Sequence, residues 1–166
     1  MAETRILMVC MGNICRSPTA EGVLRAKLKA AGLERVVEVD SAGTHGHYHA
    51  GEPPDTRAVK HAAARGYDIT RLRARRILDK DFERFDWLIA MDGDNLAHLQ
   101  SAVPAGSAAR LGLLMEHSRR FPGVREVPDP YYGAPAGFDH VLDLVEDACD
   151  GLVAALQQTG NFPAKA

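Results

Sequence analysis

The sequence predicts a single α/β domain in which helices cover both faces of a parallel β-sheet. Short apolar runs alternate with amphipathic segments along the chain, which is the pattern of strands joined by helical crossovers. The length of 166 residues is that of one domain. A hydrophobic content of 46% beside 25% charged residues is enough to bury a core without disulfide bonds.

Four short apolar runs predict the strands, over residues 5–10, 36–44, 85–92 and 109–116. Segments with helical periodicity alternate with them, over residues 17–31, 56–65, 93–102 and 138–158. Ser17 is suited to be the N-cap of the first helix, because Pro18 follows it in the first helical position. Asp55 is suited to the same role in the second helix. Gly32 and Gly66 predict where these two helices end.

The composition argues against several classes of function. The formal net charge of -2 gives no support to a nucleic-acid or membrane-surface role. No apolar stretch approaches the roughly 20 residues of a membrane span, and no basic segment precedes a long apolar one at the N-terminus. Three cysteines without framework spacing favour a reducing compartment, where paired thiols are more often catalytic, redox-active or metal-binding than structural. We therefore expect a cytoplasmic protein without nucleic-acid or membrane partners.

The loop between the first strand and the first helix carries the chemistry. Its sequence, VCMGNICRSPTAE, has the frame Cys-x5-Arg from Cys10 to Arg16. Gly12 and Asn13 tolerate positive φ, so the loop can curl and point several N–H groups at one centre. The following helix adds free N–H groups and the positive end of its dipole. The pattern predicts an anion cradle.

Cys10 would lie at the centre of that cradle, at the carboxyl end of the first strand, where ligands bind in parallel sheets. Arg16 supplies a planar two-pronged donor that matches two phosphate oxygens. Nearby cations and helix N-termini lower the pKa of a thiol, which makes Cys10 a candidate nucleophile for phosphoryl transfer. The alternative is a buried strand-end thiol beside a surface arginine. It would explain Cys-x5-Arg alone, but not the strand, Gly-Asn and Ser-Pro that accompany it.

This loop resembles the phosphate-binding loop of the low molecular weight protein tyrosine phosphatases, which reads Cys-x-Gly-Asn-x-Cys-Arg-Ser-Pro near the N-terminus. The segments SAGT (41–44), FDWLIAMD (85–92) and DPYY (129–132) also fall where that family carries similar ones, so the resemblance spans essentially the whole chain. It implies one four-stranded domain over residues 1–160 and a phosphate-binding loop after the first strand. It also implies no metal and no cofactor. The last residues, 161–166, are expected to be a frayed tail.

The resemblance assigns the catalytic roles. Cys10 is the nucleophile, Arg16 stabilises the transferred phosphoryl group, and Asp129 is the general acid and later the base. The chemistry also requires an acid, because the leaving oxygen needs a proton, and Pro128 and Pro130 limit the backbone around Asp129. The other cradle residues are expected to bind the phosphate: Met11, Gly12, Asn13, Ile14, Cys15 and Ser17.

Three of these residues have further expected roles by resemblance. Ser17 assists the departure of the thiolate when the phosphocysteine breaks down. Asn13 holds the curl of the loop through side-chain hydrogen bonds, with Ser41 among its partners. Cys15 is expected to regulate the enzyme by closing a disulfide with Cys10 on oxidation.

The expected substrate cleft has aromatic walls. Tyr131 and Tyr132 are the pair that the family places around an aryl ring, and packing of their loop onto the body is the alternative. Tyr48 or His49 is expected to supply another wall. The loop HGHYHAGEPP (45–54) contains three alternating histidines, but no carboxylate or cysteine set accompanies them, so we expect no metal site there.

One position departs from the family. Many members have a histidine near the position of Leu72, where it bonds the loop asparagine and pairs with acidic neighbours. Here Asp40 and Glu21 would need Arg73, Arg75 or water instead, and the rest of this basic run is expected to be solvated. The departure concerns the rigidity of the loop, not the reaction class.

We therefore expect a metal-independent protein tyrosine phosphatase that acts on phosphotyrosine proteins or small aryl phosphate monoesters through a phosphocysteine. We expect it to be a monomer or to self-associate weakly. An arsenate reductase of the same fold would need further redox cysteines downstream, where the sequence has Cys149 in a predicted core helix. A protein-arginine phosphatase tends to carry threonine in place of Ile14 and lacks the paired tyrosines. A non-catalytic anion-binding domain would need no acid at Asp129.

Overall fold

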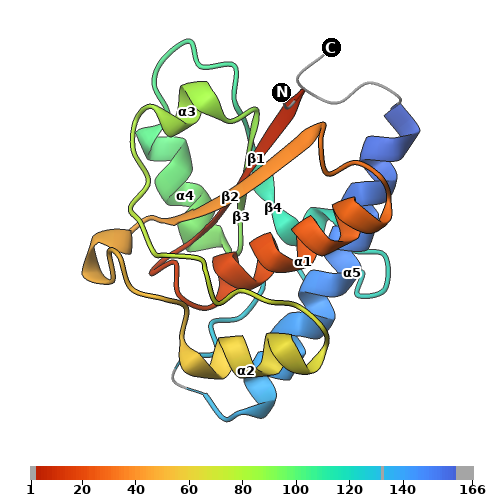
Figure 1. Ribbon diagram of the computed structural model, residues 1–166. Helices are drawn as coiled ribbons and strands as arrows, with labels where there is room; N and C mark the ends of the chain where they lie inside the picture. The colour runs from red at the N-terminus through yellow and green to blue at the C-terminus, as the bar shows by residue number, and fades with distance from the viewer. Residues whose placement is uncertain (1–2, 132, 160–166) are drawn as a thin grey trace.

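The sheet has the predicted parallel architecture. The computed structural model describes residues 3–131 and 133–159, and within these residues four strands form one parallel sheet of order β2-β1-β3-β4 (Figure 1). The strands are β1 (Thr4–Cys10), β2 (Val37–Gly43), β3 (Trp87–Ala90) and β4 (Arg110–Leu113). Each lies inside its predicted segment or within one residue of it. The fold class is confirmed, and the expected tail at 161–166 lies outside the described residues.

The helices alternate with the strands as predicted. They are α1 (Arg16–Ala30), α2 (Thr56–Ala64), α3 (Asp81–Arg84), α4 (Gly93–Ala102) and α5 (Ala136–Thr159), with short 3-10 helices η1 (Gly46–Tyr48) and η2 (Leu114–His117). Asp55 caps α2, because its side chain accepts the N–H of Arg57. The four-residue helix α3 was not predicted, since it is too short to show a helical period.

The predicted cap of α1 is wrong. The helix begins at Arg16, so Ser17 lies in its first turn and Cys15 occupies the N-cap position without a side-chain cap bond. The hydroxyl of Ser17 faces Cys10 and Asn13 instead of the helix backbone. Pro18 is still accommodated, because N–H groups of the first turn have no intrahelical partner.

Alternating side chains of β1 pack against different helices. Ile6 and Met8 face the core formed with α1 and α5, whereas Leu7 and Val9 face the core formed with Phe82 of α3 and with α4. Figure 1 shows these pairs of helices on opposite sides of the sheet. No described helix is long and apolar enough to cross a membrane.

A third, smaller core lies beneath the loop that follows β1. Ile14 and Cys15 of this loop pack against Ala58 and Ala62 of α2 and against Phe138 of α5. Figure 1 shows α2 crossing the beginning of α5 below the carboxyl end of β1. The sheet fixes the start of the loop, and this small core supports its far side.

Candidate active site

The loop from Cys10 to Arg16 is curled by one left-handed residue. Asn13 has φ of 60°, whereas Gly12, for which positive φ was also predicted, lies outside that region. The neighbouring Gly43 is required by close packing, because a Cβ there would lie 2.5 Å from the carbonyl oxygen of Met11. The curl is therefore set by Asn13, and Gly43 lets β2 approach it.

The curl presents donors to the Cys10 sulfur. The backbone N–H of Asn13 donates to Sγ over 3.3 Å, and the Ser17 Oγ lies 3.0 Å from it. Because Ser17 Oγ already accepts the Asn13 side-chain amide at 2.8 Å, its proton is available to the sulfur. Cys10 is 3% exposed and lies at the carboxyl end of β1. Its sulfur therefore has hydrogen-bond donors suited to a negative charge.

The side chain of Asn13 joins three segments of the chain. Its amide donates to Ser41 Oγ at 3.0 Å and to Ser17, and its Oδ1 accepts the backbone N–H of Arg75 at 3.0 Å. Ser41 in turn donates to the buried Glu21 at 2.7 Å. Burial raises the pKa of Glu21, although its hydrogen bond with Ser41 and the charge of Arg25 oppose the shift. The expected support by Ser41 is confirmed.

Arg75 replaces the support that Leu72 cannot give. Its backbone N–H binds Asn13, and its guanidinium contacts Asp81 at 2.9 Å and Asp40 at 3.2 Å. Arg75 therefore lies between two carboxylates, and the expected partner for Asp40 is confirmed. Arg75 was excepted from the predicted solvated run, and its partners Asp81 and Asp40 lie 6 and 35 positions away. The other acidic neighbour, Glu21, contacts Arg25 at 2.7 Å.

Arg16 lies buried behind the cradle, 3% exposed. Its Nη1 donates to Asp92 Oδ2 and to the carbonyl of Val127, and its Nη2 lies 3.7 Å from Asp129 Oδ2. Burial opposes the charge of the guanidinium, but Cys10, Asp92 and Asp129 outweigh it and raise the pKa of Arg16. The guanidinium of Arg16 therefore stays charged.

Asp129 and Tyr131 of the DPYY segment lie at the cleft over the cradle. The Asp129 carboxylate accepts the backbone N–H of Tyr131 at 3.0 Å, and its side chain is 39% exposed. Tyr131 lines the same cleft as Cys10. Tyr132 lies outside the described residues. The structure thus brings Asp129 and Tyr131 to the nucleophile, as predicted.

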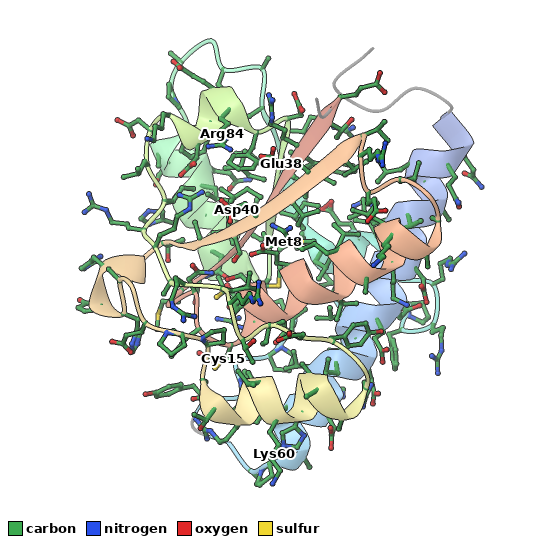
Figure 2. The ribbon with its side chains drawn as sticks, viewed as in Figure 1. Met8, Cys15, Glu38, Asp40, Lys60 and Arg84 are labelled. Carbon is green, nitrogen blue, oxygen red and sulfur yellow. The ribbon has the colours of Figure 1, made fainter. Side chains whose placement is uncertain are left out.

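The two other cysteines have different surroundings from Cys10. In Figure 2, Cys15 lies between the start of α1 and α2. Burial, and then the negative charge of Asp55, raises the pKa of Cys15, so it stays a thiol at neutral pH. Cys149 is fully buried in the core of α5, as predicted. The disulfide between Cys10 and Cys15 stays a prediction, since both are free thiols in this structure.

The cleft over Cys10 has a volume of about 390 Å³. Its walls hold most of the predicted site residues: Cys10, Met11, Gly12, Ile14, Cys15, Arg16, Tyr48, His49, Asp129 and Tyr131. Tyr48 and His49, which were predicted as alternatives, both line it. Asn13 and Ser17 lie beneath the cleft floor, where they bond the sulfur.

The three alternating histidines do not line the same cavity. His49 turns to the cleft with its Nδ1 3.2 Å from Glu52, whereas His45 and His47 line a different hollow together with His98 of α4. The rings of His45 and His98 are 5.7 Å apart. Within the described residues no group of three or more His, Cys, Asp or Glu side chains is arranged to hold a metal ion.

The sequence analysis missed Asp92, whose Oδ2 accepts a hydrogen bond from Arg16. Its other oxygen caps α4 by accepting the N–H of Asn95 at 2.8 Å. One signal could have found it, because Asp92 follows the third strand and the carboxyl ends of parallel strands meet at one edge. His98 gave no such signal, since its neighbours come from a distant loop.

A sequence model of the family described as low molecular weight phosphotyrosine protein phosphatase matches residues 5–161. The chain belongs to this family. It is 42% identical to a low molecular weight protein-tyrosine-phosphatase of Streptomyces coelicolor, over 93% of this chain and 94% of that protein. It is 43% identical to a low molecular weight phosphotyrosine protein phosphatase of Schizosaccharomyces pombe, over 86% and 90% of the two chains.

The crystal structure of a protein tyrosine phosphatase from Entamoeba histolytica, with Hepes in its active site, has the same fold. Its TM-score is 0.89 at 37% identity, and the match covers 95% of this chain and 99% of that one. This low molecular weight phosphatase is therefore a cysteine-dependent protein tyrosine phosphatase, and the predicted family, enzyme class and function are confirmed.

Proposed function

We propose that Cys10 of this phosphatase hydrolyses phosphotyrosine and other aryl phosphate monoesters by way of a phosphocysteine. One observation carries the proposal. The Cys10 sulfur receives donors from Asn13 and Ser17, while the buried charge of Arg16 and the carboxylate of Asp129 meet at the same cleft. Nucleophile, anion site and proton donor are then all within one cavity.

In the first displacement the thiolate of Cys10 attacks phosphorus as the bond from phosphorus to the phenolic oxygen breaks. Asp129 gives its proton to that oxygen, which otherwise would leave as a phenolate. Arg16 binds two equatorial oxygens of the phosphoryl group, and its charge stabilises them in the transition state. The loop N–H groups complete the site, and its residues are Met11, Gly12, Asn13, Ile14, Cys15 and Ser17.

In the second displacement Asp129, now a carboxylate, takes a proton from water. The oxygen of that water attacks phosphorus, and the bond from phosphorus to sulfur breaks, which releases phosphate. The hydroxyl of Ser17 points its proton at the departing thiolate. The same two positive elements, Arg16 and the start of α1, stabilise both transition states.

Aryl substrates suit the walls of the cleft. Tyr48, His49 and Tyr131 form its sides and Tyr132 follows directly in the chain, so a flat phenyl ring fits better than a flexible alkyl group. Phosphotyrosine proteins and small aryl phosphates are the substrates we propose, with no nucleic-acid or membrane partner. We also propose a cytoplasmic location, a monomeric or weakly associating state, and reversible oxidation in which Cys15 joins Cys10.

The test compares wild type with Cys10→Ser on phosphotyrosine and phosphoarginine peptides. The wild type should release phosphate from the phosphotyrosine peptide and not from the phosphoarginine one. Cys10→Ser should release none from either, because a serine hydroxyl without a neighbouring base stays protonated. It should still bind inorganic phosphate, which keeps Arg16 and the loop N–H groups as partners. Turnover by Cys10→Ser, or preference for phosphoarginine, would contradict the proposal.

A further inference from the structure

Arg57, near the start of α2, contacts both sides of the cleft at once. Its Nε and Nη2 bind the two oxygens of Asp55 at 3.0 and 2.8 Å, a two-pronged contact. The same Nη2 donates to the backbone carbonyl of Tyr131 at 3.0 Å. Arg57 thus joins the cap of α2 to Tyr131, 74 positions away from Arg57, in the segment that carries Asp129.

The Asp55 side of this bridge belongs to the phosphate-binding loop. The backbone N–H of Asp55 donates to the carbonyl of Ile14 at 2.8 Å. The two-pronged contact with Arg57 lowers the pKa of Asp55, so this carboxylate stays charged and keeps its contact at neutral pH. Through Asp55, the position of Arg57 is therefore fixed relative to the cradle.

The Tyr131 side of the bridge leads to the acid. The N–H of Tyr131 donates to Asp129 Oδ1 at 3.0 Å, so the place of the Tyr131 backbone sets the place of the carboxylate. Arg57 also lies over two rings, with Cζ 5.5 Å from the Tyr131 centroid and 4.8 Å from that of Phe138. The guanidinium plane is thereby fixed by contacts on its face and on its edge.

We infer that Arg57 is a positioning residue that holds the Asp129 segment at a fixed height above Cys10. The inference rests on the proposed function, since it needs Asp129 to be the acid. The side chain of Arg57 is 41% exposed. Water screens its charge, so the geometry of the fork, and not the charge, is what it contributes.

The experiment separates positioning from a merely structural role by its dependence on the leaving group. A nitrophenolate leaves almost unaided, whereas the phenolate of tyrosine, with a phenol pKa of about 10, needs the proton. Arg57→Ala should therefore lose at least about tenfold in kcat on phosphotyrosine and less than about threefold on nitrophenyl phosphate. Arg57→Lys keeps the charge but loses the two-pronged contact. Its kcat on phosphotyrosine should lie between those of wild type and Arg57→Ala.

Two controls accompany these variants. Arg71→Ala removes an exposed arginine outside the cleft and should leave kcat unchanged on both substrates. Inhibition by inorganic phosphate should change less than about threefold in Arg57→Ala, because the cradle itself is intact. If Arg57→Ala fails to fold, Arg57→Lys carries the same comparison.

The same changes in an Asp129→Asn background complete a double-mutant cycle. With the acid gone, Arg57→Ala should cost nothing further on phosphotyrosine. Equal losses on both substrates, or a full additional loss in the Asp129→Asn background, would overturn the inference. If Asp129→Asn alone were equally impaired on both substrates, the proposed role of Asp129 would fail first, which separates the two failures.

Discussion

The two sides of the cleft are built differently. On the cradle side, Cys10, Asn13 and Arg16 are each 3% exposed or less, and the Asn13 side chain bonds three separate segments. On the opposite side, the Asp129 side chain is 39% exposed and accepts a backbone N–H two residues away. The nucleophile is held by buried residues of the core, whereas the acid is held by contacts at the surface.

This difference predicts how substitutions on the two sides of the cleft should affect activity. A change in the cradle removes charge stabilisation for every substrate and also disturbs buried packing. A change at the acid affects only the substrates whose leaving group needs a proton. The ratio of rates on phosphotyrosine and nitrophenyl phosphate therefore tells which side of the cleft a variant has altered.

After Cys10→Ser, which should abolish turnover, the largest effect should come from Arg16→Lys. A lysine offers a point charge and cannot reproduce the two-pronged contact, so kcat should fall by about 10³-fold or more. The loss should be similar on phosphotyrosine and nitrophenyl phosphate, because the phosphoryl group is the same. Steady-state kinetics on the two substrates gives the measurement. A variant within about tenfold of wild type would show that the loop N–H groups suffice.

Asp129→Asn should come next and should split the two substrates. We expect a loss of about 10²-fold or more on phosphotyrosine and a much smaller loss on nitrophenyl phosphate. Equal losses on the two substrates would mean that Asp129 only shapes its turn. Asp92, Asp94 and Glu126 would then be the next acids to test.

Asn13→Ala and Asn13→Gly form a matched pair on the cradle side. Both remove the side-chain hydrogen bonds, and we expect a loss of about tenfold or more on both substrates. Both residues must adopt the left-handed φ of 60°, which costs alanine about 1 kcal/mol or more and costs glycine nothing comparable. The thermal midpoint of Asn13→Ala should lie about 2–4 °C below that of Asn13→Gly for each kcal/mol. A midpoint of Asn13→Ala above that of Asn13→Gly would argue against backbone strain, because glycine already loses stability through its freedom in the unfolded chain.

The smallest effect, on stability alone, should come from Glu21→Gln. Burial raises the pKa of Glu21, so folding favours its protonated form, and that contribution is lost as pH rises through the raised pKa. Glutamine does not titrate. The free energy of unfolding of Glu21→Gln should therefore increase relative to that of wild type between about pH 4 and pH 7, which means that the variant becomes the more stable of the two as pH rises. A constant difference across that range would show that Arg25 already compensates the charge.

Much of the fold was predictable because its elements are local. Spacing alone found α4 from Gly93 to Ala102 and the capping role of Asp55. The start of α1 was misplaced because the Ser17 hydroxyl serves the Cys10 sulfur, a contact between residues seven positions apart. At Ser17 the contact with the nucleophile therefore outweighs the preference of serine for the N-cap position.

The candidate site was predictable where its residues belong to one sequence motif. It was less predictable where residues distant in sequence come into contact. The motif contains Cys10, Asn13 and Arg16 within one loop. By contrast, Arg75 reaches Asn13 from 62 positions away, and Arg16 reaches Asp92 across 76. No pattern of neighbours encodes such distances, so the structure was needed to find these partners.

The strand order also places the nucleophile and one wall of the substrate cleft on different strands, so that each can be changed independently. β1, which carries the nucleophile, lies between two strands, whereas β2 lies at the edge and leads to the loop that supplies Tyr48 and His49. That loop is tied at its base, where the Gly51 N–H donates to Ala74 and a Cβ on Gly46 would meet the Arg75 carbonyl at 2.1 Å. Beyond the base, its residues can be exchanged without breaking a ladder bond of the sheet. New substrate preferences can therefore be grafted onto an unchanged catalytic cradle.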